Sequence, residues 1–152
     1  MMEQLGNFLD STLAFISIKK FVERKGEYLS FLQKGKKSWG KYYSTQDLIL
    51  QLEAGLLTIV ELRNKGELRL CLLVRTNNYA TRVELEIGFI IGEGYFANKE
   101  TMGMLLDHIE NLAASHGYTH VTMPVKQAFV KGISTWGYGI EYVQLIKDLQ
   151  NG

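Results

Sequence analysis

Apolar residues near the start of the chain recur every three or four positions, the period of a helix buried on one face. The run from Phe8 through Leu13 to Lys20 keeps this spacing. We expect Gly26 to end or bend this helix, and a shorter apolar piece to run from Tyr28 to Leu32. The first third of the chain is therefore predicted to be helical.

A capping pattern predicts the start of a second helix. Ser44 precedes Asp47 by three residues, so the serine hydroxyl can accept from the backbone N–H of the first turn. The pattern predicts a helix from Thr45 to about Ala54. Gly55 follows, where a left-handed conformation ends many helices.

The period then changes from three or four residues to two, which is typical of half-buried strands. Alternating segments run over residues 57–62, 68–74 and 82–91, and Asn64–Lys65–Gly66 offers a tight turn between the first two. Three strands joined by two short turns predict an antiparallel meander.

A glycine-flanked loop, Gly92 to Glu100, leads into a helical pattern that stops at Gly117. An apolar strand over residues 121–125 comes next, and strand, helix and strand of this length normally form a parallel pair with a right-handed crossover. A short helix around 127–135 and a last strand over 140–149 complete the prediction. We expect an α/β fold (α+β, mixed sheet) in one domain, residues 1–152, with a helical extension or layer over 1–43 and a core over 44–149.

Composition narrows the function classes only slightly. Hydrophobic residues make up 46% of the chain and the net charge is +1, so a folded core is expected and no acidic partner is indicated. Cys71 is the single cysteine, which points to a reducing compartment such as the cytoplasm. No apolar run approaches the ~18 residues of a spanning helix, and no secretory signal begins the chain. His116 and His120 are four apart, but Gly117 separates their faces, so no metal site is predicted.

The most unusual composition lies in the segment from Lys34 to Tyr43, which holds four lysines, three aromatics and no acid. Lysines with interleaved aromatics can hold phosphates and stack on bases. They can also contact another protein, because Trp and Tyr are common interface anchors. A third interpretation is a solvated linker whose aromatics cover the sheet.

The order of elements around the loop Gly92 to Glu100 resembles the GNAT family, the GCN5-related N-acyltransferases, over residues 44–149. In that family this loop and the following helix hold the pyrophosphate of acetyl-CoA on backbone N–H groups. The family signature, Gln/Arg-x-x-Gly-x-Gly/Ala, matches at Gly103 but meets Thr101 and Asn98 at its other two positions, so the motif is degenerate. The resemblance implies contacts with acetyl-CoA, or another acyl-CoA, at Ile91, Asn98, Lys99, Thr101, Gly103 and Met104.

The resemblance also implies catalytic roles. The family often takes its general base from a glutamate on the strand before the loop, where Glu86 and Glu84 share one face. The alternative is a solvated strand face with charges paired to Arg82 or Arg75. The usual general acid is a tyrosine, whose position here is taken by Ile133; Tyr138 or Tyr142 would have to replace it.

Two hypotheses follow. The first is an acyl-CoA-dependent N-acyltransferase acting on a primary amine. The second is a GNAT-like domain without catalysis, a structural or interaction protein similar to small GNAT-like proteins of tailed phages, in which Tyr95 and Phe96 fill the cofactor gap. Such a protein would be cytoplasmic or inside a phage particle and would contact a protein partner or a second copy through residues 1–43. Nucleic acid is a further possible partner through the basic aromatic segment, and no membrane contact is expected.

Overall fold

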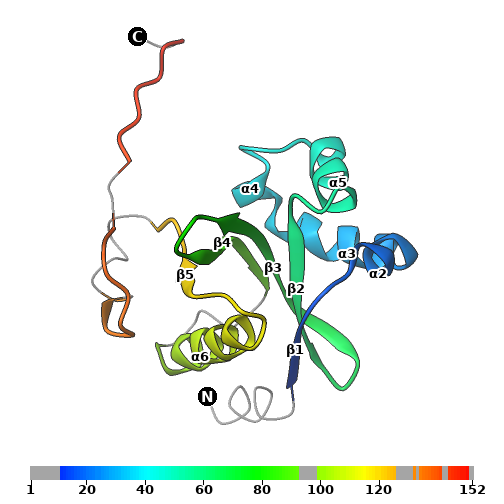
Figure 1. Cartoon of the computed structure of the whole chain (residues 1–152). Helices are drawn as coiled ribbons and strands as arrows, with labels where there is room; N and C mark the ends of the chain where they lie inside the picture. Colours follow the sequence, from blue (N-terminus) through cyan, green and yellow to red (C-terminus); the bar gives the residue numbers. More distant parts are fainter. Residues whose placement is uncertain (1–10, 93–98, 126–131, 133, 142–143, 151–152) are drawn as a thin grey trace.

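The computed structural model describes residues 11–92, 99–125, 132, 134–141 and 144–150. They form a five-stranded sheet with helices on both faces (Figure 1). The strands follow in the order of the sequence: β1 Ser11–Phe15, β2 Thr58–Asn64, β3 Glu67–Asn78, β4 Val83–Gly92 and β5 His120–Thr122. The first four are antiparallel, and β5 runs parallel to β4. The mixed α/β sheet and its antiparallel meander are confirmed.

The predicted helix from Phe8 to Lys20 is wrong over residues 11–17, because residues 11–15 form β1, and it is right only from Ile18 onward, where α2 begins. This strand pairs with β2 along its whole length. Leu13 and Phe15 are half-buried against the α6-side core, whereas Thr12 and Ala14 are exposed, which is the alternation of an edge strand rather than the stripe of a helix. A helix starts only after Ser17, whose hydroxyl accepts from the backbone N–H of Lys20 at 3.1 Å.

The remaining N-terminal helices are short and follow one another closely. They are α2 Ile18–Glu23, α3 Lys25–Leu32, the 3-10 turn η1 Gln33–Gly35, α4 Lys36–Trp39 and α5 Thr45–Glu53. The expected break at Gly26 is wrong, since the chain leaves the helical conformation at Arg24 and Gly26 lies inside α3. The cap at Ser44 is confirmed by its bond from the Asp47 N–H at 3.1 Å. Gly55 has the positive φ of a helix stop, +75°.

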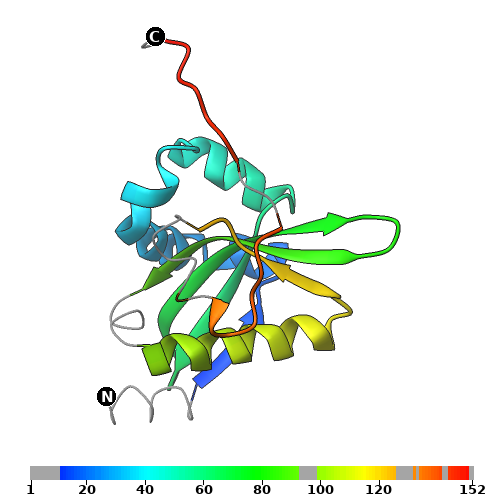
Figure 2. The same ribbon diagram turned by 90° about the vertical axis from the view of Figure 1, so that its left-hand side faces the viewer.

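Each face of the sheet has its own apolar core. Helices α2–α5 cover one face and α6, Lys99–Ser115, covers the other (Figure 2). The α2–α5 face buries Ile59, Cys71 and Leu73, whereas the α6 face buries residues one position along, such as Leu72. A register shift between β3 and β4 places an extra residue, Gly88, in β4, because Leu73 pairs with Phe89 and Val74 with Ile87.

The expected last strand over 140–149 is absent from the described part of that segment. Residues 144–150 adopt no regular structure, and Leu145 and Ile146 are each 91% exposed. Because these two apolar residues are adjacent, a strand here would turn one of them to each face of the sheet. The described part of the chain also offers no strand beyond β5 with which this segment could pair. The expected short helix around 127–135 falls mostly outside the described residues. None of the described helices is both long and apolar enough to cross a membrane.

Candidate active site

The sheet opens where β4 parts from β5. Their parallel pairing joins Glu84 to His120, Leu85 to Val121 and Glu86 to Thr122. Beyond Glu86, β4 continues to Gly92 while no described residue pairs with it on the β5 side. The bulge at Gly88 lies at the start of this stretch. A strand edge without a partner offers backbone N–H and C=O groups to an extended ligand.

Glu86 lies at the last paired position before the opening. Its neighbours Leu85 and Ile87 are buried against the α6 face, so Glu86 points to the other face. The side chain is half-buried, and its Oε1 accepts from Nδ2 of Asn77 at 3.3 Å. Its cross-strand neighbour is Arg75. Glu86 is thus a half-buried carboxylate whose hydrogen-bond partner among the described residues is a neutral amide, and an ionised carboxylate has further lone pairs that can accept a proton.

Glu84 shares this face but has different surroundings. Its Oε2 pairs with Nη2 of Arg82 at 2.5 Å, and the side chain is 10% exposed. The same guanidinium binds Glu141 through Nη1 at 2.8 Å, which ties the C-terminal segment to the start of β4. Glu84 therefore fits the interpretation as a paired strand-face charge, and Glu86 is the better placed candidate base.

Aromatic side chains from the N-terminal helices lie over the same face. Tyr42 and Tyr43 contact the ring of Phe89, with centroids 5.8 and 6.4 Å away. The Tyr43 hydroxyl accepts from Nη2 of Arg75 at 3.1 Å. Trp39 anchors this segment, since it is fully buried and donates from Nε1 to the Leu32 carbonyl at 2.7 Å. The basic aromatic segment thus covers part of the sheet.

The resemblance to the GNAT family implies that the start of α6 contacts the phosphates of acyl-CoA. Thr101 is fully buried, and Met104 is partly buried against the apolar core of the α6 face. At Gly103 a β-carbon would lie 2.8 Å from Nε1 of Trp136, so the indole occupies the space that the glycine leaves free. Ile91 is 3% exposed and fills the space above Gly35, so its side chain faces the helical layer. Asn98 lies outside the described residues, and α6 begins at Lys99.

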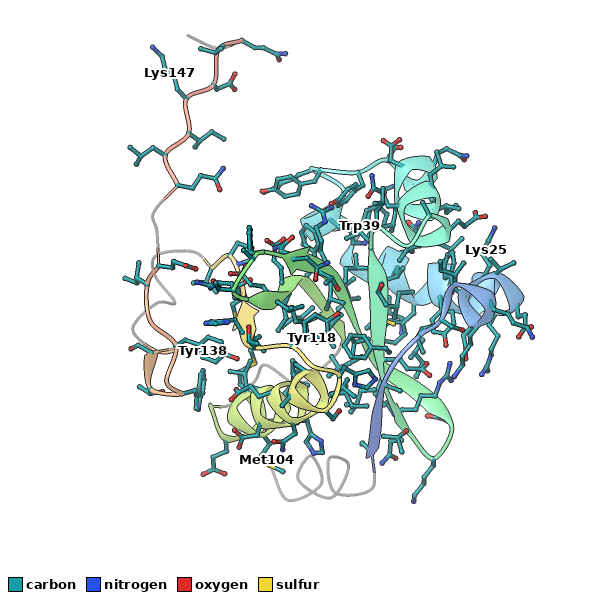
Figure 3. All side chains as sticks on the ribbon, viewed as in Figure 1. Lys25, Trp39, Met104, Tyr118, Tyr138 and Lys147 are labelled. Atoms are coloured by element: carbon teal, nitrogen blue, oxygen red, sulfur yellow. The ribbon has the colours of Figure 1, made fainter. Side chains whose placement is uncertain are left out.

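Tyr138 lies beside α6, on the opposite face from Glu86 (Figure 3). Its hydroxyl donates to Oε2 of Glu110 at 3.2 Å. Burial, and then the charge of Glu110, raise the pKa of Tyr138 well above its ordinary value. The structure does not bring Tyr138 together with Glu86, and Tyr142 lies outside the described residues.

Three other features of the site were missed or left open by the sequence. Asn77 and Tyr43 hold the carboxylate and the guanidinium, and only the strand register reveals them. Trp136 could have been suspected, because a glycine inside a helix costs about 1 kcal/mol and so indicates a close neighbour. No group of three or more metal-binding side chains occurs among the described residues.

No protein-family model and no curated protein sequence matches the chain, whereas many solved structures do. A ribosomal-protein-alanine N-acetyltransferase from Brucella melitensis biovar Abortus 2308 superposes with a TM-score of 0.64 at 10% identity, covering 91% of this chain and 99% of that one. An aminoglycoside acetyltransferase from an uncultured soil metagenomic sample, in complex with sisomicin, gives 0.64 at 8% identity, with coverages of 93% and 97%. An aminoglycoside N-acetyltransferase in complex with CoA gives 0.60 at 10% identity, with coverages of 91% and 95%. The chain therefore has a GNAT-like fold.

Proposed function

We propose that the protein is an acyl-CoA-dependent N-acyltransferase in which Glu86 takes a proton from a primary amine. The observation that carries this proposal is the position of Glu86. It is a half-buried carboxylate without an ion pair to any described residue, at the point where β4 loses its partner strand. Such a group can accept the proton of an ammonium ion and leave the nitrogen lone pair free for acyl transfer.

The residues present fit the acyl-bearing arm of the cofactor better than its phosphates. No described residue pairs with the β4 edge beyond Glu86, and the arm of acyl-CoA carries amides that can pair with backbone groups there. When bound, acyl-CoA supplies an acyl group activated as a thioester, and CoA leaves as its thiol. The first turn of α6 would hold phosphate on its N–H groups, but the Trp136 ring covers Gly103 and would have to move.

The chain's own residues then have separate tasks. Asn77 donates from its amide to Oε1 of Glu86, which holds the carboxylate in one orientation. Tyr43 contacts the ring of Phe89 on the same face of the sheet and accepts from Arg75, the cross-strand neighbour of Glu86. Glu86 removes one proton from the bound ammonium, and the neutral amine nitrogen is then the nucleophile.

A thermal shift with millimolar acetyl-CoA tests the proposal first. Ligand at 100 times its dissociation constant stabilises a protein by about 2.7 kcal/mol. Release of CoA thiol on addition of primary amines then tests catalysis. A well-folded sample without any shift and without thiol release would contradict the proposal. Glu86→Gln removes the proposed base and should abolish thiol release. Glu67→Gln is its matched control, since Glu67 is an exposed glutamate on the neighbouring strand.

A noncatalytic role is the second candidate, favoured by Trp136 over Gly103 and by Tyr138 held on Glu110. In that case the domain would serve as a structural or interaction protein, such as a component of a phage particle. It would contact a protein partner or a second copy through residues 1–43. The absence of an acetyl-CoA shift in both the native chain and a Trp136→Ala variant would favour this candidate.

A further inference from the structure

The charged residues of β3 and β4 fall into two groups. The two strands carry five charged residues: Glu67, Arg69, Arg75, Glu84 and Glu86. Glu67 and Arg69 pair with each other at 2.7 Å, and Glu84 pairs with Arg82, which lies just before β4. Arg75 and Glu86 form no ion pair with any described residue. They nevertheless stand directly opposite one another in the strand register.

Each member of this pair is held by a neutral group. The Arg75 guanidinium donates to the Tyr43 hydroxyl at 3.1 Å, and the Glu86 carboxylate accepts from Asn77 at 3.3 Å. Opposite residues in an antiparallel pair have their β-carbons about 5 Å apart, so the two side chains could meet. Both are half-buried instead and remain apart. A charge that is partly removed from water without a counter-charge is a ready site for a ligand of opposite sign.

We propose that Arg75 and Glu86 are the two poles of the acceptor site, and that the acceptor is a primary amine carrying a carboxylate or phosphate close to its amino group. Glu86 holds the ammonium, and the guanidinium of Arg75 binds the anion through its planar fork of N–H groups. This inference rests on the proposed function, because it assigns the acceptor of the same reaction. It goes beyond that function by requiring two charges on one small molecule.

The surroundings favour a small acceptor with both charges near each other. Arg82, the other arginine at this end, is already bound by Glu84 and Glu141, so it offers no second anion site. Tyr43 contacts Arg75 through its hydroxyl and Phe89 through its ring, so these two aromatics can contact the carbon chain between the charged groups. A ligand that spans Arg75 and Glu86 therefore lies across β3 and β4 rather than along one strand.

Three primary amines of similar size test whether the anion is recognised: β-alanine has a carboxylate, 2-aminoethyl phosphate has a phosphate, and β-alaninamide has neither. Binding to the full chain is measured by calorimetry without acyl-CoA, and acylation is measured with acetyl-CoA. We expect one or both anionic probes to be favoured over β-alaninamide by on the order of 10- to 100-fold in binding and in kcat/KM. The better anionic probe identifies which anion the site prefers.

Variants then assign that preference to one residue. Arg75→Gln should remove the advantage of the anionic probes and leave β-alaninamide unchanged, whereas Arg75→Lys, which keeps the charge, should retain part of it. Arg69→Gln is the matched control, because Arg69 lies on the same strand about 20 Å away and pairs with Glu67. Near-equal binding of all three probes, or an anion preference that persists in Arg75→Gln, would overturn the inference.

The two binding measurements keep this inference separate from the proposed function. Binding of acetyl-CoA together with turnover that ignores the anion would leave the acyltransferase proposal standing and reject the two-pole acceptor site. Conversely, Arg75-dependent binding of an anionic probe without any acetyl-CoA binding would reject catalysis and keep the site. If no probe binds, the two-pole site is rejected.

Discussion

Two charged clusters lie on the same face of the sheet, and they differ in how completely their charges are paired. In the cluster under α2 and α3, Glu61 is 3% exposed and accepts three bonds, from Lys20 Nζ at 2.9 Å, the Tyr28 hydroxyl at 2.9 Å and Arg63 Nε at 2.7 Å. Arg63 also binds Glu27 with two N–H groups, and that hydrogen bonding lowers the pKa of the Glu27 carboxyl. Every charge of this closed cluster has a partner within the chain.

At the open cluster, near the β4–β5 opening, the opposite holds. Arg75 and Glu86 are cross-strand neighbours, yet each is bound by a neutral side chain and not by the other. Buried charges that satisfy one another serve the fold, and a half-buried pair that stays apart has capacity left for a ligand. The comparison predicts that changes in the closed cluster affect stability and that changes in the open cluster affect binding and turnover.

The largest effect is expected from Glu61→Gln. This change removes the buried negative charge that Arg63, itself only 10% exposed, and the partly exposed Lys20 share, so the free energy of unfolding should fall by about 3–5 kcal/mol. Urea unfolding measures it, and Glu67→Gln, whose side chain is 69% exposed, should change stability by less than about 0.5 kcal/mol. Equal losses in the two variants would remove the distinction between paired and unpaired regions.

Glu86→Gln should show the reverse profile. The variant keeps the shape and the contact with Asn77 but cannot accept the ammonium proton, so kcat/KM for amine acylation should fall by at least about 100-fold, close to 3 kcal/mol. Its urea midpoint should stay near that of the native chain. Retention of full turnover would exclude Glu86 as the base, and a large loss of stability would place it with Glu61 as a structural charge.

Tyr28 allows the closed cluster to be tested by pH. Burial is the main cause that raises its pKa from 10.0 to about 12. Since the unfolded chain then releases this proton first, the stabilisation is complete below about pH 10 and is lost as the pH rises towards 12. Tyr28→Phe should flatten this decline and cost about 1 kcal/mol at neutral pH through the lost bond to Glu61. Unfolding measured from pH 8 to 11.5 compares the two chains, and an identical decline in both would contradict the assignment. Cys71 adds a decline of its own to both chains from about pH 9 upward, because burial also raises the pKa of its thiol above the ordinary 9.0.

The sequence predicted the meander and several turns because those signals are local. Lys65 and Gly66 have positive φ, 52° and 81°, as the turn at Asn64 required, and the Ser44 cap formed as expected. The errors occurred where distant partners decide. Residues 11–15 satisfy helical spacing nearly as well as alternation, and only β2 makes them a strand. The segment over 140–149 has apolar residues but no described neighbouring strand to pair with.

The candidate site shows the same limit. Glu84 and Glu86 are two residues apart with an arginine available to each, so the sequence could not separate them. Only the three-dimensional contacts assign Arg82 to Glu84 and turn Arg75 to Tyr43. Gly103 could be recognised as a position that needs a close neighbour, but nothing in the sequence identified that neighbour as Trp136.

The smallest effect concerns whether the cofactor end of the site is closed by Trp136. The ring lies over Gly103 at the start of α6, so phosphate binding there requires the ring to leave. Trp136→Ala removes that cost without altering α6 and should tighten acetyl-CoA binding several-fold, or about 1 kcal/mol. Tyr138→Phe is the control, because it removes the bond to Glu110 in the same segment and keeps the indole in place.

Calorimetry with the two variants and the native chain gives the comparison. In the native chain, indole fluorescence should change on binding, since the other tryptophan, Trp39, is fully buried among the helices and should report little. Weaker binding in Trp136→Ala would instead make the indole a contact for the cofactor. Unchanged binding would place the phosphates away from Gly103, and the opening at β4 alone would then define the cofactor site.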